Sequence, residues 1–141
     1  MICFTDEIIN LDPTKLQGFF VGWPNPPSPA THLELLKNSD EVVLAIAAET
    51  EAVVGFITAI TDQVLSAYIP LLEVLPAYQH QGIGKQLVER MLDKLRHLYM
   101  VDLHCDPGLQ GFYSQFEMIP ADGMMRRHYH NQAGVADKSR V

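Results

Sequence analysis

Residues 71–85 constrain the fold most, because a short apolar run changes there into a glycine loop and then into a helix. Pro76 ends the apolar run, since a proline cannot donate to a strand ladder. Gly82-Ile83-Gly84 then opens a helix whose apolar residues recur at three- and four-residue spacing: Leu87, Val88, Met91, Leu92, Leu95 and Leu98. The next apolar run, residues 100–105, is predicted to be a strand. A strand-helix-strand crossover predicts one parallel strand pair.

Two further helices are predicted before this segment. Asp12-Pro13 and Ser28-Pro29 each place a capping side chain before a proline, which is typical of a helix N-terminus. The first helix would turn Leu16, Phe19 and Phe20 inward, and the second would end at about Asn38. Residues 23–29 hold four prolines, which predicts an extended loop.

The remaining segments predict an α/β (α+β) fold with a mixed, mostly antiparallel central sheet and about four flanking helices. Valine- and isoleucine-rich runs predict a hairpin, and a third strand follows it. The chain would close with a short helix and a last strand. The predicted ranges are strands at 41–48, 53–60, 66–75 and 124–129, and a helix at 109–116.

Length and charge narrow the function. A chain of 141 residues predicts one domain, here residues 1–130, followed by a flexible tail at 131–141. Ten basic residues against 17 acidic ones give a net charge of −7. The electrostatic field of this negative charge repels phosphate backbones, which argues against nucleic-acid binding. It attracts cations such as protonated amines.

The two cysteines, Cys3 and Cys105, form no metal-binding or disulfide pattern, so neither a zinc site nor a disulfide framework is expected. Residues 1–10 do not resemble a signal peptide, and the longest apolar run is too short to cross a bilayer. These features predict a cytoplasmic protein without a membrane partner.

The glycine loop is suited to bind an anion. The first amides of a helix lack intrahelical partners and carry partial positive charge, and glycine lets a ligand approach the backbone closely. Lys85 adds a cation at the rim. The alternative is a turn that needs glycine for its geometry alone. The loop lacks the Lys-Ser/Thr pair of a Walker motif and the third glycine of a dinucleotide fingerprint.

The run Gln79-x-x-Gly82-x-Gly84, after a strand ending Val74-Leu75-Pro76, resembles the coenzyme A motif of the GNAT superfamily of acyltransferases. Val54-Gly55-Phe56 resembles the third strand of that family, and Phe112-Tyr113 its fourth helix. The resemblance extends from about residue 11 to residue 129.

Gly22-Trp23 and Asn38-Ser39 resemble the chloroplast serotonin N-acetyltransferase-like members of that superfamily. The family often has Gly-Phe where this chain has Glu117-Met118. This difference concerns the geometry of the closing strand and does not affect the cofactor site.

The resemblance implies an N-acetyltransferase that moves the acetyl group of acetyl-coenzyme A directly to a primary amine of a small molecule or peptide. It implies a bulged, splayed strand where Leu72 and Val74 offer backbone groups to the pantetheine arm. The other expected cofactor-binding residues are Gln79, His80, Gln81, Gly82, Ile83, Gly84 and Lys85. The alternative function is an acyl-coenzyme A sensor or regulatory domain without turnover, and the assembly of a homodimer stays open. No metal is expected.

The resemblance also implies Tyr113 as the general acid, since a phenol keeps its proton at neutral pH; its alternative role is packing. Asp106 is a candidate base by likeness to the chloroplast-type members, or a helix cap. Glu73 is a second candidate, because burial disfavours a charged carboxylate and would suit it to accept a proton. Its alternative is an outward-facing strand position. His104 ranks third and is expected to be structural.

Overall fold

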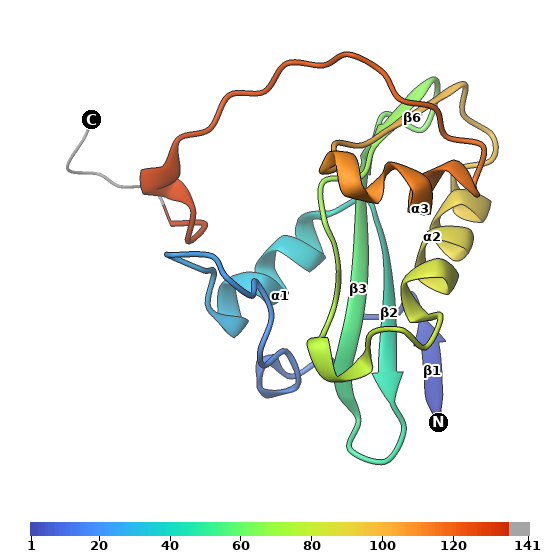
Figure 1. Ribbon diagram of the computed structural model, residues 1–141. Coiled ribbons are helices and arrows are strands. Elements are labelled where there is room, and N and C mark those ends of the chain that lie inside the picture. The colour runs from blue at the N-terminus through green and yellow to red at the C-terminus, as the bar shows by residue number, and fades with distance from the viewer. Residues whose placement is uncertain (136–141) are drawn as a thin grey trace.

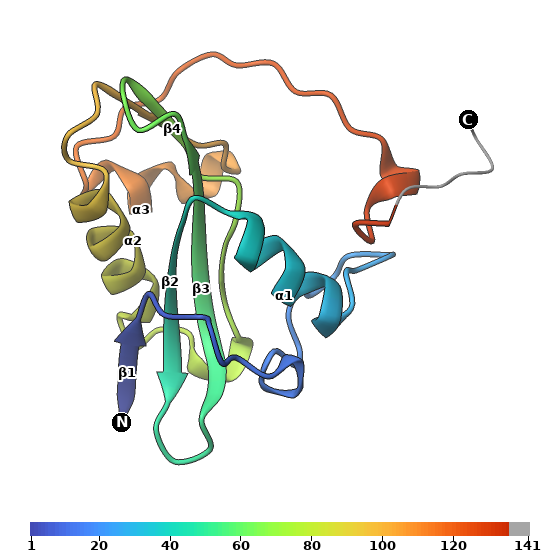
Figure 2. The same cartoon turned by 180° about the vertical axis from the view of Figure 1, so that it is seen from behind.

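The computed structural model describes residues 1–135 and shows a sheet covered by helices on both faces. In Figures 1 and 2, α1 (Pro29–Asn38) lies on one side of the sheet, and α2 (Ile83–Lys94) and α3 (Gln110–Ser114) lie on the other. Within the described residues there are three α-helices, one fewer than the roughly four predicted.

The missing helix is the first one. Asp12 caps only a 3₁₀ turn, η1 (Pro13–Lys15), where its carboxylate accepts a hydrogen bond from the Thr14 amide at 2.9 Å. Gly18 then adopts a φ of 88° and Phe20 a φ of 63°, conformations that a right-handed helix excludes. Leu16, Phe19 and Phe20 are nevertheless buried, as predicted, because the loop itself packs against α1 and the sheet.

The predicted mixed sheet is confirmed. Five strands pair in the order β1-β2-β3-β4-β6, and β5 pairs with β3 beside this path. Within residues 1–135, the β4–β6 pair is the one parallel pair. The bounds are β1 (Ile2–Thr5), β2 (Glu41–Ala47), β3 (Ala52–Thr61), β4 (Ser66–Tyr68), β5 (Leu72–Val74) and β6 (Met100–Asp102).

The strand predicted at 66–75 is divided into β4 and β5 by an irregular segment. Tyr68 pairs with Ile60 and Leu72 pairs with Ile57, so three residues here face two on β3. One extra residue is the signature of a β-bulge. The resemblance implied a bulge within 72–74, but the extra residue lies at 69–71, where Pro70 cannot donate to a ladder.

The C-terminal part differs from the prediction. The expected helix at 109–116 is a 3₁₀ turn, η3 (Pro107–Leu109), followed by α3. The strand expected at 124–129 is absent from the described residues. Figure 1 shows why: the segment after α3 arches over the end of the sheet to the α1 side, where η4 (Tyr129–Asn131) lies. Along this path residues 124–129 pair with no strand of the described residues.

The far end of this arch is attached near α1. The backbone N–H of Asn25 donates to the Gln132 side chain at 3.0 Å. Residues 136–141, the greater part of the predicted tail, lie outside the described residues. The division into a domain at 1–130 and a tail at 131–141 therefore stays a prediction.

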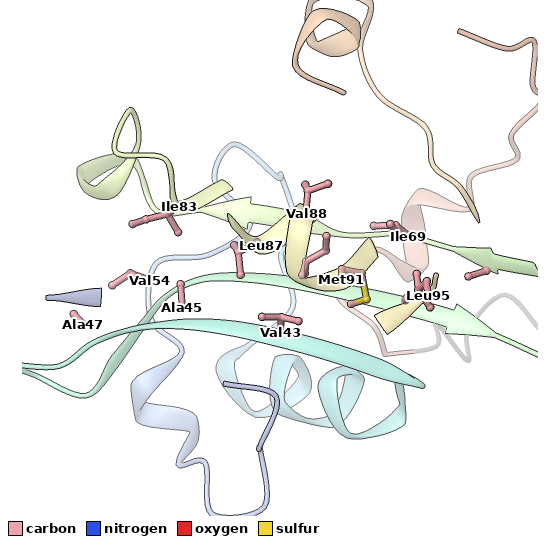
Figure 3. Packing of buried hydrophobic residues seen from close by; sticks show 13 residues of the cluster. Val43, Ala45, Ala47, Val54, Ile69, Ile83, Leu87, Val88, Met91 and Leu95 are labelled. Carbon is pink, nitrogen blue, oxygen red and sulfur yellow. The ribbon is translucent and has the colours of Figure 1, made fainter. Parts of the chain in front are cut away.

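Two apolar clusters stabilise the sheet, one on each face. Figure 3 shows the larger one, in which the predicted apolar face of α2 packs on β2 and β3 through Leu87, Val88 and Met91. The Gly55 position permits this contact, because a Cβ there would meet Leu87 at 3.1 Å and the Glu73 carbonyl at 3.3 Å. No helix in residues 1–135 is long and apolar enough to cross a membrane.

Candidate active site

The sheet opens between β5 and the end of β6. The parallel pairing of β4 with β6 ends where the Ile69 amide donates to the Asp102 carbonyl at 2.9 Å. Beyond that point β5 pairs with β3 alone, and no strand in the described residues covers its outer edge. The resulting split is the splayed geometry that the sequence resemblance implied.

Leu72 and Val74 direct their backbone polar groups into this opening. The Thr58 amide donates to Leu71, and the Leu75 amide donates to Val54. Because ladder bonds alternate along an antiparallel strand, the N–H and C=O groups of Leu72 and Val74 point away from β3. An extended amide-containing ligand could pair with these groups as a neighbouring strand would.

A cavity of about 850 Å³ occupies the opening. The N-terminal loop, β5, the chain after β6, α3 and the C-terminal arch all contribute to its wall. The residues that matter for the chemistry are Val21, Trp23, Leu72, Glu73, Val74, Gln79, Asp106, Tyr113 and Arg127. A second cavity of about 660 Å³ lies between the end of β6, α3 and residues 117–125, and it shares Tyr113 with the first.

The glycine loop lies between β5 and α2. His80 has a φ of 64° and Gly82, the N-cap of α2, a φ of 81°. The first bond of the helix is donated by the Gln86 amide to the Gly82 carbonyl at 3.1 Å. The amides of Ile83, Gly84 and Lys85 precede it, and in the part of the chain that the structure describes they donate to no acceptor, so they are available to an anion. A Cβ at Gly82 would meet nothing within 4 Å, so the space before the loop is open.

Lys85 lies on the solvent-exposed face of α2 and pairs with Glu89 at 3.9 Å.

Gln79 has a role that the sequence did not indicate. Its side-chain amide donates to the Val74 carbonyl at 3.0 Å. Gln79 thereby ties the glycine loop to the open edge of β5.

Tyr113 lies on α3, half-buried at the junction of the two cavities. Burial raises the pKa of its phenol above the ordinary value of 10.0, and the nearby Cys105 thiol raises it further. Tyr113 is therefore protonated at neutral pH, as a proton donor must be. The ring also packs edge-to-face against Phe112, with centroids 5.0 Å apart.

Glu73 lies on β5 opposite Phe56 and is half-buried. It is not an outward-facing residue, because its carboxylate turns to the N-terminal loop. Oε1 accepts from the Phe20 amide at 2.8 Å, and Oε2 accepts from the Val21 amide at 3.3 Å. Both oxygens of this candidate base are thus engaged by backbone donors.

Asp106 occupies the N-cap position of η3, but its side chain makes no capping hydrogen bond. The exposed carboxylate lines the same cavity as Tyr113. His104 also lines both cavities, and its ring packs edge-to-face on Tyr68 with centroids 5.7 Å apart. The structure thus brings Tyr113, Glu73 and Asp106 to one cavity.

The sequence reasoning missed several residues of this wall. Val21, Cys105, Met125 and Arg127 carry no motif. Only the fold brings these residues together. Among the described residues, no group of three or more His, Cys, Asp or Glu side chains could hold a metal ion.

A model of the acetyltransferase (GNAT) family matches residues 8–118. A crystal structure from Deinococcus radiodurans R1, of a protein assigned as an acetyltransferase, is 41% identical with a TM-score of 0.92. That match covers 96% of this chain and 94% of the other.

A curated relative, GCN5-related N-acetyltransferase 1, chloroplastic, from Arabidopsis thaliana, is 29% identical over 111 residues. The match covers 77% of this chain but only 56% of that protein, so the chain spans about half the length of this relative. AAC(6')-Iy, solved with the bisubstrate analogue CoA-S-monomethyl-acetylneamine, shares the fold at 14% identity and a TM-score of 0.64. It covers 91% of this chain and 97% of its own.

Proposed function

This chain belongs to the acetyltransferase (GNAT) family, and from that premise we propose that it transfers the acetyl group of acetyl-coenzyme A directly to a primary amine of a small molecule or peptide. One observation supports this proposal most. The open edge of β5, Gln79 of the glycine loop and Tyr113 all line one cavity of about 850 Å³, and the same loop continues from Gln79 to the N-terminus of α2.

The residues present fit coenzyme A. The amides of residues 83–85 would hold the pyrophosphate, together with the loop residues Gln79, His80, Gln81 and Gly82 and the Lys85 side chain. Leu72 and Val74 would pair with the pantetheine amides. The bound analogue of AAC(6')-Iy is a coenzyme A derivative, which is consistent with this use of the fold. When bound, the cofactor would supply an activated acetyl thioester.

The chain's own residues would supply the proton transfers. Tyr113 would donate a proton to the departing sulfur, since burial keeps its phenol protonated. Asp106 would accept the proton of the ammonium, directly or through a water. Its carboxylate lines the cavity and makes no capping bond, whereas the Glu73 carboxylate is bound by two amides. Of the two candidates, we therefore propose Asp106 as the base.

The cavity wall outside the proposed cofactor site combines apolar side chains with charges of both signs, those of Asp106 and Arg127. Val21, Trp23, Leu109 and Met125 give apolar walls, and Asp106 provides a negative charge. The net charge of −7 also favours a cationic partner. These features support an amine with an apolar body as the acceptor.

The test is turnover of acetyl-coenzyme A with a panel of arylalkylamines, polyamines and peptide amino termini, followed by thiol release. Acetylation of at least one amine, lost in Tyr113→Phe, would support the enzyme. Tight binding of coenzyme A without acetylation of any amine would instead favour the sensor or regulatory domain.

A homodimer remains a prediction with one structural support. Ile119, Met124 and Met125 lie exposed on the C-terminal arch, and a second copy could cover them. Light scattering would measure the oligomeric state directly.

A cytoplasmic location is likewise a proposal, and the relative from Arabidopsis thaliana carries a chloroplastic name.

A further inference from the structure

We propose that Glu73 is a positioning residue that fixes the turn at residues 20–23, and with it the Trp23 side chain, on the acceptor side of the cavity. This inference deepens the proposed acetyl transfer and rests on it only for the kinetic part of its test. It gives Glu73 a role other than that of a base.

The first observation is the geometry of the two hydrogen bonds. The amides of Phe20 and Val21 are successive, and both donate to the one carboxylate, at 2.8 and 3.3 Å. Successive amides that converge in this way form a concave anion site, often called a nest. The anion of this nest is the Glu73 side chain, which comes from a strand 53 residues further along the chain.

The second observation is the turn that these amides begin. The Trp23 amide donates to the Phe20 carbonyl at 3.1 Å, which closes a four-residue turn. Gly22 is its third residue and has a φ of 82°, as a type II turn requires there. Phe20 itself has a φ of 63°, an uncommon conformation for a bulky residue that surrounding contacts must maintain. Glu73 supplies such a contact at the Phe20 amide.

The third observation is where the turn places its side chains. The Phe20 ring is buried and packs on Trp23, with ring centroids 4.8 Å apart. Val21 and Trp23 then form part of the cavity wall, together with Glu73 itself. Val21 and Trp23 belong to neither the glycine loop nor β5, so their part of the wall is left for the acceptor. Trp23 is 38% exposed, which makes its indole available to a ligand.

The Glu73 carboxylate on β5 thus holds the turn at residues 20–23, and this turn holds Trp23 in the wall of the acceptor pocket. Loss of the carboxylate would free two amides and release the turn. Trp23 would then lose its fixed orientation, which should weaken acceptor binding more than it slows the chemical step. A base would behave in the opposite way, because its removal acts on the rate and on its pH dependence.

Trp23 is the only tryptophan of the chain, so its fluorescence reports on this turn alone. The experiment measures acrylamide quenching of Trp23 in the wild type, Glu73→Ala, Glu73→Gln and Gly22→Ala, with circular dichroism as a check on folding. Glu34→Gln, an exposed glutamate on α1, is the matched control. Glu73→Ala and Gly22→Ala should increase quenching clearly. Glu73→Gln should stay close to the wild type, because its amide oxygen can still accept from Phe20.

The kinetic arm uses an amine that the wild type acetylates. Glu73→Ala should raise the acceptor KM by about tenfold, the effect of about one lost hydrogen bond to a charged group. It should leave kcat and the shape of the pH profile nearly unchanged, and Glu73→Gln should largely rescue KM. Gly22→Ala should reproduce the KM effect while the carboxylate is intact.

Two results would overturn the inference. The first is unchanged Trp23 quenching in folded Glu73→Ala and Gly22→Ala. The second is a Glu73→Gln variant that loses kcat and the acidic limb of its pH profile as severely as Glu73→Ala, which would make Glu73 the base. If no amine is acetylated at all, the proposed function fails, and the quenching data still decide the role of Glu73.

Discussion

The Gln79 side-chain amide donates a hydrogen bond to the Val74 carbonyl at 3.0 Å, which joins the glycine loop to the open edge of β5. In the proposed cofactor site, the loop would hold the pyrophosphate and the strand edge would hold the pantetheine arm. This one bond therefore fixes the relative placement of two parts of the site that would bind one ligand.

Gln79→Ala should weaken coenzyme A binding about fivefold, the effect of losing about one net hydrogen bond that organises the loop. Calorimetric titration with coenzyme A would measure it. Gln17→Ala, which changes an exposed glutamine elsewhere in the chain, is the control and should bind like the wild type. Equal affinities for both variants would show that the bond does not organise the site.

Gly82→Ala should reduce coenzyme A affinity by about tenfold or more, because an L-residue at its φ of 81° costs roughly 1–2 kcal/mol and the loop would relax away from that shape. The added methyl group meets no neighbour within 4 Å, so a clash inside the protein does not contribute. Gly111→Ala, also without a neighbour at that distance but lacking a positive φ, is the matched control. Unchanged affinity in Gly82→Ala would remove the glycine loop from the cofactor site.

Tyr113→Phe should lower kcat by ~10²–10⁴-fold while coenzyme A affinity stays near the wild-type value. The substitution keeps the ring that packs on Phe112 and removes only the proton. Because burial and the Cys105 thiol raise the pKa of Tyr113 above 10.0, the wild type should keep this activity throughout the neutral range. An unchanged single-turnover rate in Tyr113→Phe would leave Tyr113 with a packing role only.

Asp106→Asn should lower kcat/KM and remove the acidic limb that the carboxylate sets in its pH profile, because the amide cannot accept the proton of the ammonium. The residual rate should then follow only the ionisation of the amine substrate, so its rise with pH moves to the range where free amine forms. Asp93→Asn, which alters an exposed aspartate of α2 that pairs with Arg96, is the control and should keep the wild-type profile. If Asp106→Asn also keeps that profile and rate, the amine loses its proton to solvent before it binds.

The parts of the site that depend on local sequence were predictable. The apolar spacing from Leu87 to Leu95 fixes which face of α2 is buried, and Pro76 with Gly82 fixes where the strand ends and the helix begins. Ser28 caps α1 as its sequence position indicates, by accepting from the Thr31 amide at 3.1 Å. Each of these features is decided within a few residues.

The parts that depend on distant partners were not predictable. The apolar neighbours of Glu73 in sequence indicated a buried base, but its carboxylate binds amides in a loop that no local pattern places beside it. Apolar and polar residues do not alternate regularly along residues 124–129. This segment leads to η4, which lies on the α1 side of the molecule. The prediction of one continuous strand at 66–75 overlooked Pro70, which lies within the segment where β4 gives way to β5.

His32 makes a prediction about acid stability. Its ring is 1% exposed among Phe19, Phe20 and Phe56, and in the described residues neither ring nitrogen has a hydrogen-bond partner. Burial lowers the pKa of His32 from 6.5 to about 4. The unfolded chain therefore binds a proton more readily than the folded one, and His32 favours unfolding as the pH falls from 6.5 to about 4.

The wild type should thus lose up to about 3 kcal/mol of unfolding free energy across that window through His32 alone, since one pKa unit corresponds to about 1.4 kcal/mol. His32→Leu should lack this component and should also be more stable near neutral pH, because it no longer buries two unpaired nitrogens. Urea unfolding at several pH values would measure both effects. His128→Gln, at an exposed histidine, should keep the wild-type pH dependence. A His32→Leu variant that loses stability in acid as steeply as the wild type would show that other groups dominate acid unfolding.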